Sequence, residues 1–211
     1  MAEDTSRAPS ILDRRRLSRR RSDTGSEVAR IKTDGIHTWT EAEIAQFEER
    51  HPIGTKARLA FALLLYTAQR RSDVVGMGRR HVRNGTIAVR QQKTGTMLQI
   101  PVHPKLREAL GATFDKHLTF LVTEFGKPFS FAGFGNCDRC AEVGLPKECS
   151  AHGLRKAACR RLAEAGCTAH QIRAISGHAS LRDVERYTKA ADQAELARQA
   201  FEKEQRRTDV G

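Results

Sequence analysis

One stretch of the 211-residue chain constrains its fold more than any other. Residues 59–65, Leu-Ala-Phe-Ala-Leu-Leu-Leu, are apolar nearly all round. A helix without a polar face has to be buried inside a protein. We therefore expect a core helix from about Thr55 to Thr67. Because 39% of the residues are hydrophobic, the chain can build one sizeable domain around this helix.

Strand signals lie in the middle of the chain. Asn84-Gly85 is a typical tight-turn pair. Residues 86–91 and 97–102 flank the segment Lys93-Thr94-Gly95-Thr96, and this arrangement predicts a β-hairpin with Lys93 at its tip. A further strand is expected over residues 118–122.

Helical signals dominate on both sides of this hairpin. Thr40 and Glu43 form a capping box, which predicts a helix that ends near Arg50. Further helices are expected over residues 104–113, 152–165, 169–176, 181–187 and 193–206. The predicted fold class is therefore mostly α (α+β): a helical domain with a small antiparallel β-sheet.

The chain is strongly basic, with a formal charge of +12 and a pI near 10.0. This charge favours a polyanionic partner, nucleic acid before membrane. Residues 1–30 contain eight Arg and five acidic residues and few apolar ones, so we expect a disordered basic leader that either contacts DNA or has no role. Neither a membrane-spanning run nor a signal-peptide core is present in the sequence, which predicts a cytoplasmic protein.

The last third of the chain offers the groups that breaking a DNA phosphodiester requires. The reaction needs a nucleophile, cations for the phosphate oxygens and an acid for the leaving oxygen. His152-x-x-Arg155 places a His and an Arg on one face of a helix. Gly177-His178 follows, and then Tyr187, whose hydroxyl can hold the phosphate covalently and so conserve the bond energy for rejoining.

In order and spacing, these residues resemble the tyrosine recombinase (phage integrase) family. Residues 67–74 look like the family's first motif, usually Thr-Gly-Leu-Arg-x-Ser-Glu-Leu, which makes Arg70 the first catalytic Arg and Asp73 the supporting acid. Residues 91–95 resemble its β-hairpin lysine segment, which contains Lys93. The resemblance covers residues 38 to about 198 and implies a catalytic domain over residues 38–206.

The resemblance also implies a role for each residue. Tyr187 attacks the phosphate and forms a 3′-phosphotyrosyl link, and Arg70 and Arg155 hold the non-bridging oxygens. By the same resemblance, His178 donates a hydrogen bond to the phosphate, and Lys93 is the general acid to the 5′-oxygen. His152 assists proton transfer from Tyr187, and Asp73 orients Arg70 or His152. Neither a metal nor another cofactor is implied.

The chain departs from the family pattern at two places in the first motif. Ala68-Gln69 replaces the usual Gly-Leu, and Ala68 suits that position unless a positive φ is required there. Asp73 is one methylene shorter than the usual Glu. Both changes leave the catalytic groups in place.

A second hypothesis concerns the cysteines. The spacing Cys137-x2-Cys140-x8-Cys149-x2-His152 is that of a zinc site, and it competes with the recombinase interpretation for His152. The alternative is reduced cysteines near a loop. An odd total of five Cys disfavours a complete disulfide framework.

The partner implied by the resemblance is double-stranded DNA, bound by a homo-oligomer in a tetrameric synapse, so the protein would be nucleoid-associated when bound to DNA. The residues before Thr38 are too few and too polar for the family's amino-terminal clamp domain, so a truncated integrase is expected. Leu196, Ala200 and Phe201 form an apolar stripe that packs either in cis or on a neighbouring protomer. Alternative functions are a non-catalytic DNA-binding protein and a type IB topoisomerase-like nicking enzyme.

Overall fold

The computed structural model describes residues 35–113, 117–130 and 137–208. The predicted leader over residues 1–30 lies outside them. The helices are α1 (Glu41–Arg50), α2 (Lys56–Thr67), α3 (Arg71–Val74), the 3₁₀ helix η2 (Arg79–His81), α4 (Pro104–Ala112), α5 (Cys137–Ala141), α6 (Ala151–Glu164), α7 (Ala169–Ser176) and α8 (Leu181–Thr208). The strands are β1 (Val82–Arg83), β2 (Thr86–Arg90) and β3 (Met97–Pro101). The predicted fold class, helical with a small antiparallel sheet, is confirmed.

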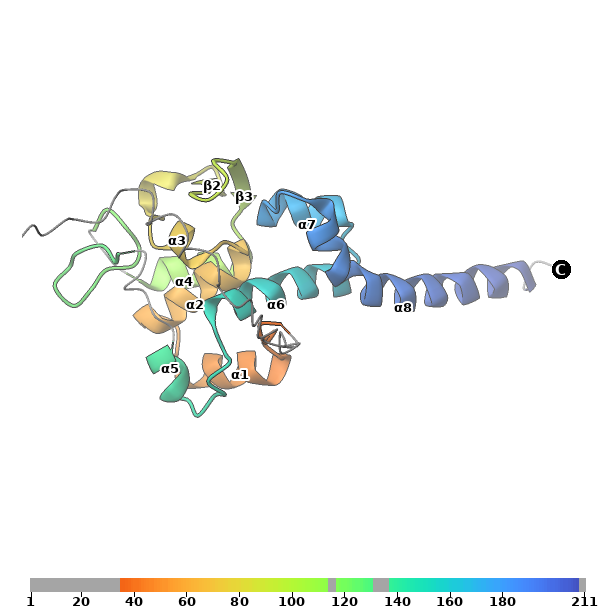
Figure 1. The fold of residues 1–211 in the computed structure, drawn as a ribbon, viewed down its shortest axis with the longest axis horizontal. Helices are drawn as coiled ribbons and strands as arrows, with labels where there is room; N and C mark the ends of the chain where they lie inside the picture. Colours follow the sequence, from red (N-terminus) through yellow and green to blue (C-terminus); the bar gives the residue numbers. More distant parts are fainter. Residues whose placement is uncertain (1–34, 114–116, 131–136, 209–211) are drawn as a thin grey trace, which may run out of the picture. The chain divides into compact units, whose positions relative to one another are not determined.

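Helix α2 is the buried core helix that its sequence predicts. Every side chain from Leu59 to Leu65 is at most 7% exposed. The helix contacts α4 and α6 (Figure 1). Phe61 of α2 stacks on Phe47 of α1 with ring centroids 4.7 Å apart, and its centroid lies 5.7 Å from that of Trp39. One hydrophobic core therefore joins α1, α2, α4 and α6.

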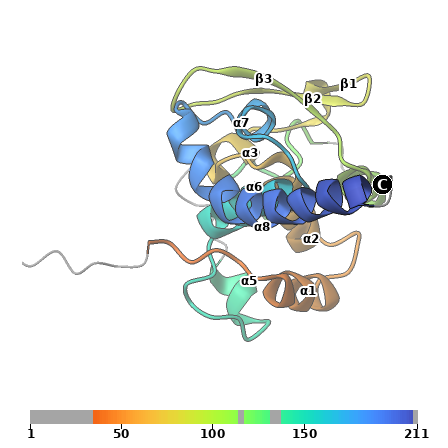
Figure 2. The same cartoon turned by 90° about the vertical axis from the view of Figure 1, so that its right-hand side faces the viewer.

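The predicted β-hairpin is confirmed and is part of a three-stranded antiparallel sheet in the order β1-β2-β3. Asn84 and Gly85 join β1 to β2 with φ of 48° and 73°, the two positive values that a tight type I′ turn requires. Ile87 pairs with Ile100, and both side chains are buried. Strand β3 contacts α7, which lies beside the sheet in Figure 2.

Two expectations about local structure are wrong. Residues 118–122 do not form a strand, because only a single bridge between Val122 and Pro128 pairs this segment. The break expected after residue 187 does not occur, and α8 continues to Thr208. Residues 188–192 contain neither Gly nor Pro, so the helix has no reason to end there.

The beginning of α8 is the part that packs on the rest of the domain. Val184 is fully buried and lies in a cluster with Cys159 of α6 and Ile172 of α7, and Tyr187 packs against this cluster. Further along, Phe201 is 67% exposed, and the second half of α8 extends away from the other helices in Figure 1. Tyr187 thus sits on the anchored part of the helix. In the described part of the chain, we find no helix apolar and long enough to cross a bilayer.

Candidate active site

The side chain of Arg155 joins three distant segments of the chain. It is only 2% exposed. Its Nη1 donates to the carbonyl of Ala68 at the end of α2 (2.8 Å), and its Nη2 donates to the carbonyl of Ser176 at the end of α7 (3.0 Å). Helix carboxyl ends leave carbonyls without helical partners and carry partial negative charge, so a cation is stabilised there. The α2–α3 junction, α6 and the α7–α8 turn therefore meet at one guanidinium.

Arg70 is brought beside Arg155 by a sharp turn. Ala68 ends α2 in the left-handed conformation (φ 53°, ψ 27°), so this position does require a positive φ, and an alanine adopts it at a cost of roughly 1 kcal/mol. Nη1 of Arg70 is buried and has no hydrogen-bond partner among the described residues. Burial and the neighbouring charge of Arg70 lower the pKa of Arg155 to about 10. Two close guanidinium groups with spare donors form a site for an anion.

His178 lies on the α7–α8 turn and Tyr187 lies in the first part of α8, and both are near Arg155. Gly177 ends α7 with a φ of 64° and leads directly to His178. The His178 Nδ1 and the Ser176 Oγ are hydrogen-bonded at 2.7 Å. The ring centroids of His178 and Tyr187 are 6.4 Å apart. The structure thus brings a tyrosine hydroxyl and an imidazole to the edge of the arginine pair.

Burial, together with the positive charge of the two arginines, shifts the pKa values of the ionisable groups in the site. Burial first, and then Arg155 and Arg70, lower the pKa of His178 to about 4. The pKa of His152 is lowered by partial loss of water and by the same arginines. Both imidazoles are therefore neutral near pH 7. Burial raises the pKa of Tyr187, so its hydroxyl keeps its proton until a base accepts it.

Asp73 and Lys93 are placed differently from the other predicted residues. Asp73 is buried, and its Oδ1 accepts a hydrogen bond from the backbone N–H of Gln92 (2.9 Å), while its Oδ2 has no partner within the described segments. Among the described residues, the carboxylate of Asp73 makes no hydrogen bond to the side chain of Arg70 or of His152, and it joins α3 to the hairpin instead. Lys93 lies exposed on the turn between β2 and β3, and its side chain makes no hydrogen bond to the other predicted residues there.

Two further residues belong to this region, although the motifs alone did not single them out. Gln69 and Gln91 are fully buried and hydrogen-bonded to each other, with the Gln91 Nε2 donating to the Gln69 Oε1 at 2.7 Å. The sequence offered one indication of this pair. Gln69 is a polar amide at a position that is usually Leu in the first motif of the tyrosine recombinase family.

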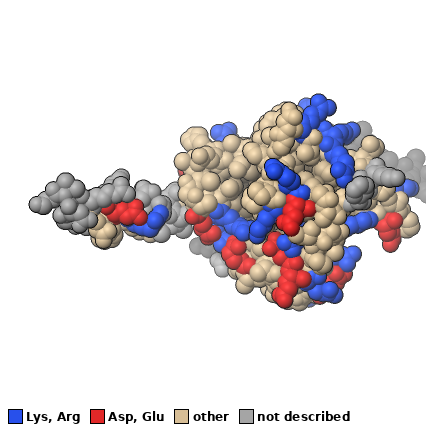
Figure 3. All heavy atoms as spheres, turned by 180° about the vertical axis from the view of Figure 1, so that it is seen from behind, with Lys and Arg blue, Asp and Glu red and all other residues tan. Residues whose placement is uncertain are grey.

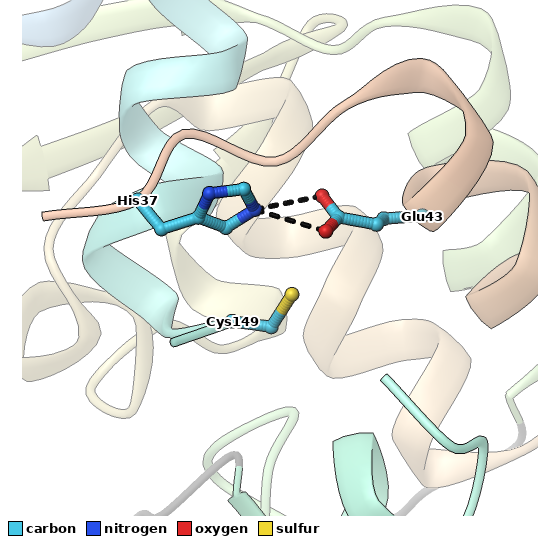
Figure 4. A group of neighbouring side chains, drawn as sticks. All are labelled: His37, Glu43 and Cys149. Atoms are coloured by element: carbon cyan, nitrogen blue, oxygen red, sulfur yellow. Dashed lines mark hydrogen bonds and ion pairs between the residues drawn. The ribbon is translucent and has the colours of Figure 1, made fainter. Parts of the chain in front are cut away.

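The predicted cysteine and histidine quartet is not the metal-ligand group that the structure forms. Among described residues, the atoms that lie within 4.8 Å of one another belong to His37, Glu43 and Cys149 (Figure 4). His152 instead faces the arginines, and the side chain of Cys137 lies outside the described residues. The His37 Nε2 is 2.9 Å from both carboxylate oxygens of Glu43, which also caps α1. These hydrogen bonds account for the group without a cation.

Comparison with known proteins identifies the class to which this fold and site belong. The sequence profile of the phage integrase family matches residues 40–194, which is most of the chain. The chain therefore belongs to the phage integrase family. It is 29% identical over 160 residues to the tyrosine recombinase XerC of Rhodospirillum centenum (strain ATCC 51521 / SW), covering 69% of this chain and 46% of that relative. The chain thus spans about half the length of the curated relative it matches.

Solved structures share the fold. The XerA recombinase superimposes with a TM-score of 0.66 at 20% identity, over 77% of this chain and 63% of that one. The Tn1549 transposon integrase in complex with transposon right end DNA superimposes with a TM-score of 0.64 at 21% identity, over 80% of this chain and 68% of that one. A lambda integrase dimer bound to a COC′ core site superimposes with a TM-score of 0.60 at 22% identity, over 72% of this chain and 59% of that one. These likenesses establish a tyrosine recombinase catalytic-domain fold.

Proposed function

We propose that this chain cleaves and rejoins DNA strands in site-specific recombination, in integration or excision, through a 3′-phosphotyrosyl link to Tyr187. One observation carries the proposal: Arg70 lies beside Arg155, Arg155 lies near Tyr187, and a buried donor of Arg70 has no partner among the described residues. Two like charges held together in a protein interior are costly unless an anion compensates them. A DNA phosphate supplies such an anion in addition to the buried carboxylate of Asp73, which also acts on Arg155.

The proposed reaction exchanges one phosphate ester for another. The hydroxyl oxygen of Tyr187 bonds to phosphorus, and the bond from phosphorus to the 5′-oxygen breaks. The negative charge that develops on the non-bridging oxygens faces Arg70 and Arg155, whose fixed charge suits this role. His178 donates a further hydrogen bond once the phosphate favours its protonated form. Rejoining is the reverse reaction, with a 5′-hydroxyl as the attacking group.

Two proton transfers accompany the exchange. The proton of Tyr187 goes to His152, whose lowered pKa keeps it neutral and able to accept. Lys93 gives a proton to the departing 5′-oxygen, so the product is a 5′-hydroxyl. Because Lys93 lies on the exposed hairpin turn, we propose that it reaches the scissile bond when DNA lies against the sheet.

The surface around the sheet supports DNA as the substrate. Residues 74–107 contain seven Lys and Arg, all exposed, and neither Asp nor Glu. On the face shown in Figure 3, basic side chains gather toward the edge that carries the sheet, whereas acidic ones lie mainly in the lower half. Basic side chains on one face bind DNA through its phosphates, and the affinity of this chain for DNA should fall steeply with added salt.

We further propose that the chain acts as an oligomer on DNA. Related structures include a lambda integrase dimer bound to a core site and a tetramer bound to a Holliday junction. In this chain, an apolar groove of about 610 Å³ lies between α2, α6 and the segment after β3, lined by Tyr66, Val102, Leu162 and Ile175 among others. The exposed Phe201 of α8 is the kind of apolar side chain that such a groove accepts from a neighbouring copy.

The test is capture of a covalent protein–DNA adduct. A library of duplexes with randomised sequence and a single nick is incubated with the protein, denatured and separated on a gel. The nick lets the freed 5′-end diffuse away, so the phosphotyrosyl adduct accumulates, and sequencing the bound strand gives the target site. We expect an adduct with the natural chain and complete loss in Tyr187→Phe, with native DNA binding retained.

The matched control is Tyr66→Phe, because Tyr66 and Tyr187 are the two tyrosines of the chain. This variant should form the adduct normally. An adduct that persists in Tyr187→Phe refutes the assignment of the nucleophile. DNA binding without any adduct from the natural chain points to a non-catalytic DNA-binding protein, and relaxation of supercoiled plasmid without sequence preference points to a topoisomerase-like enzyme.

A further inference from the structure

A pair of buried glutamines links the arginine site to the hairpin turn that carries Lys93. Gln69 and Gln91 are both 0% exposed, although burial of an amide is unfavourable unless its hydrogen bonds are made. Here they are all made. The Gln69 Nε2 donates to the carbonyls of Thr67 (3.0 Å) and Ile175 (2.8 Å), and its Oε1 accepts from the Gln91 Nε2 (2.7 Å).

The amide of Gln91 is equally complete. Its Nε2 also donates to the carbonyl of Ser176 (2.8 Å), and its Oε1 accepts from the Thr94 hydroxyl (2.8 Å). The Ser176 carbonyl is the same one that accepts from Arg155 (3.0 Å). The network therefore runs without interruption from the arginine site to the residue that follows Lys93.

Lys93 is held through its neighbours on both sides. The residue before it, Gln92, donates its backbone N–H to the Oδ1 of Asp73 (2.9 Å), and the residue after it, Thr94, is bound to Gln91. Within the turn, the N–H of Gly95 donates to the carbonyl of Gln91 (2.8 Å). The backbone at Lys93 is thus fixed relative to α3 and α7, while its side chain is exposed.

The α7–α8 turn is shaped to receive this network. A Cβ at Gly177 would lie 2.5 Å from the Gln91 Nε2, so only glycine leaves room for the amide. Gly177 is followed by His178. One buried amide therefore contacts the carbonyl bound by Arg155, the glycine before His178 and the turn of Lys93.

We propose that the Gln69–Gln91 pair is a positioning device that holds the Lys93 turn in register with the Arg70–Arg155 phosphate site. The proposal rests on the function proposed above and deepens it. Neither glutamine reaches the reacting atoms, and both act through Lys93. Replacing Gln69 by Leu, the residue that the family pattern has at this position, removes the donor to the carbonyls of Thr67 and Ile175 and the acceptor that orients Gln91. Replacing Gln91 by Leu removes the donor to Gln69 and Ser176 and the acceptor of the Thr94 hydroxyl, which frees the turn.

The test compares two DNA substrates at the target site found by adduct sequencing. One carries the ordinary 5′-oxygen at the scissile bond, and the other carries sulfur there. A thiol has a pKa near 8.5, so a thiolate leaves without a proton and a general acid is unnecessary. Lys93→Ala is the reference variant and should slow only the oxygen substrate, by about 100- to 10,000-fold.

We expect Gln69→Leu and Gln91→Leu to slow cleavage of the oxygen substrate by roughly 10- to 100-fold, as small misplacements of catalytic groups do, and to cleave the sulfur substrate close to the natural rate. Thr94→Val, which removes only the bond from the turn to Gln91, should show the same pattern more weakly. Thr96→Val, a matched change on the same exposed turn, should leave both rates unchanged.

A merely structural role for the glutamines predicts an equal loss on both substrates, and that result overturns the proposal, as does unchanged cleavage of both. A measurement that needs no activity separates this proposal from the function on which it rests. Amide hydrogen exchange at Gln92 and Gly95 should become at least about tenfold faster in Gln91→Leu, with the β2–β3 ladder unaffected. Unchanged amide exchange refutes the role of the Gln69–Gln91 pair in holding the turn. Failure of the natural chain to form any adduct instead refutes the proposed function.

Discussion

The glycine between the two predicted catalytic residues of α6 offers a sharp test of the packing. Gly153 lies between His152 and Leu154, inside a helix, where alanine is usually more stable than glycine by about 1 kcal/mol. A Cβ at Gly153 would lie 2.4 Å from the backbone carbonyl oxygen of His37 and 2.9 Å from the Cδ1 of Trp39. The usual benefit of alanine should therefore be reversed at this position.

The size of the reversal follows from what the new methyl group meets. The His37 atom is backbone, and Trp39 is fully buried, with its Nε1 donating to the carbonyl of Ser150 (3.0 Å). Neither neighbour can move away freely. Overpacking in such a site costs about 1–3 kcal/mol, which exceeds the gain in helix propensity. We expect Gly153→Ala to lower the free energy of unfolding by up to about 2 kcal/mol.

The matched control is Gly111→Ala in α4, because a Cβ at Gly111 meets no atom within 4 Å. This change should raise the free energy of unfolding by about 0.5–1 kcal/mol. Thermal unfolding can separate the two, since 1 kcal/mol shifts the midpoint of a domain of this size by about 2–4 °C. If Gly153→Ala raises the midpoint as much as Gly111→Ala does, the close approach of His37 and Trp39 to α6 is refuted.

Two further predictions follow from the charges of the site. The pKa of His178 falls from its ordinary 6.5 to about 4 on folding, so between these values the unfolded chain binds a proton that the folded chain excludes. Stability should therefore decrease as the pH is lowered from about 6.5 toward 4, and urea unfolding at several pH values should show a shallower decrease in His178→Gln; identical pH profiles contradict the shift. Arg155→Lys should lower the free energy of unfolding by about 1–3 kcal/mol and reduce adduct formation, because one ammonium cannot reach both carbonyls that the guanidinium binds; unchanged stability in the same urea assay argues against that bidentate contact.

Local chemistry made much of the fold predictable. The apolar run of α2, the Thr40–Glu43 capping box and the Asn84-Gly85 turn are each recognisable within a few residues, and the structure confirms all three. The strand expected over residues 118–122 is absent because its formation depends on more than local sequence. A strand exists only where another strand pairs with it, and that pairing depends on residues far away in the sequence.

The candidate site residues also include some that motif order is enough to select and one, Lys93, whose side-chain position it does not predict. Their order along the chain selected Arg70, Arg155, His178 and Tyr187 as candidates, and in the structure Arg70 and His178 lie near Arg155, with His178 also near Tyr187. It does not bring the side chain of Lys93 into hydrogen-bonding contact with them in the described part of the chain. The order of motifs predicts which residues take part, whereas the reach of a long side chain on an exposed turn depends on what binds there.

The sequence by itself determined that this chain forms a basic helical domain with a small sheet, and that it belongs among proteins with phage integrase motifs. Only the tertiary structure decided how the motifs are joined. Arg155 binds the ends of two helices, α2 and α7, and Gln69 contacts Gln91 at the start of the β2–β3 turn. Local patterns report hydrophobicity and backbone preference, but a buried hydrogen bond between distant segments is set by the packing that excludes water from both partners.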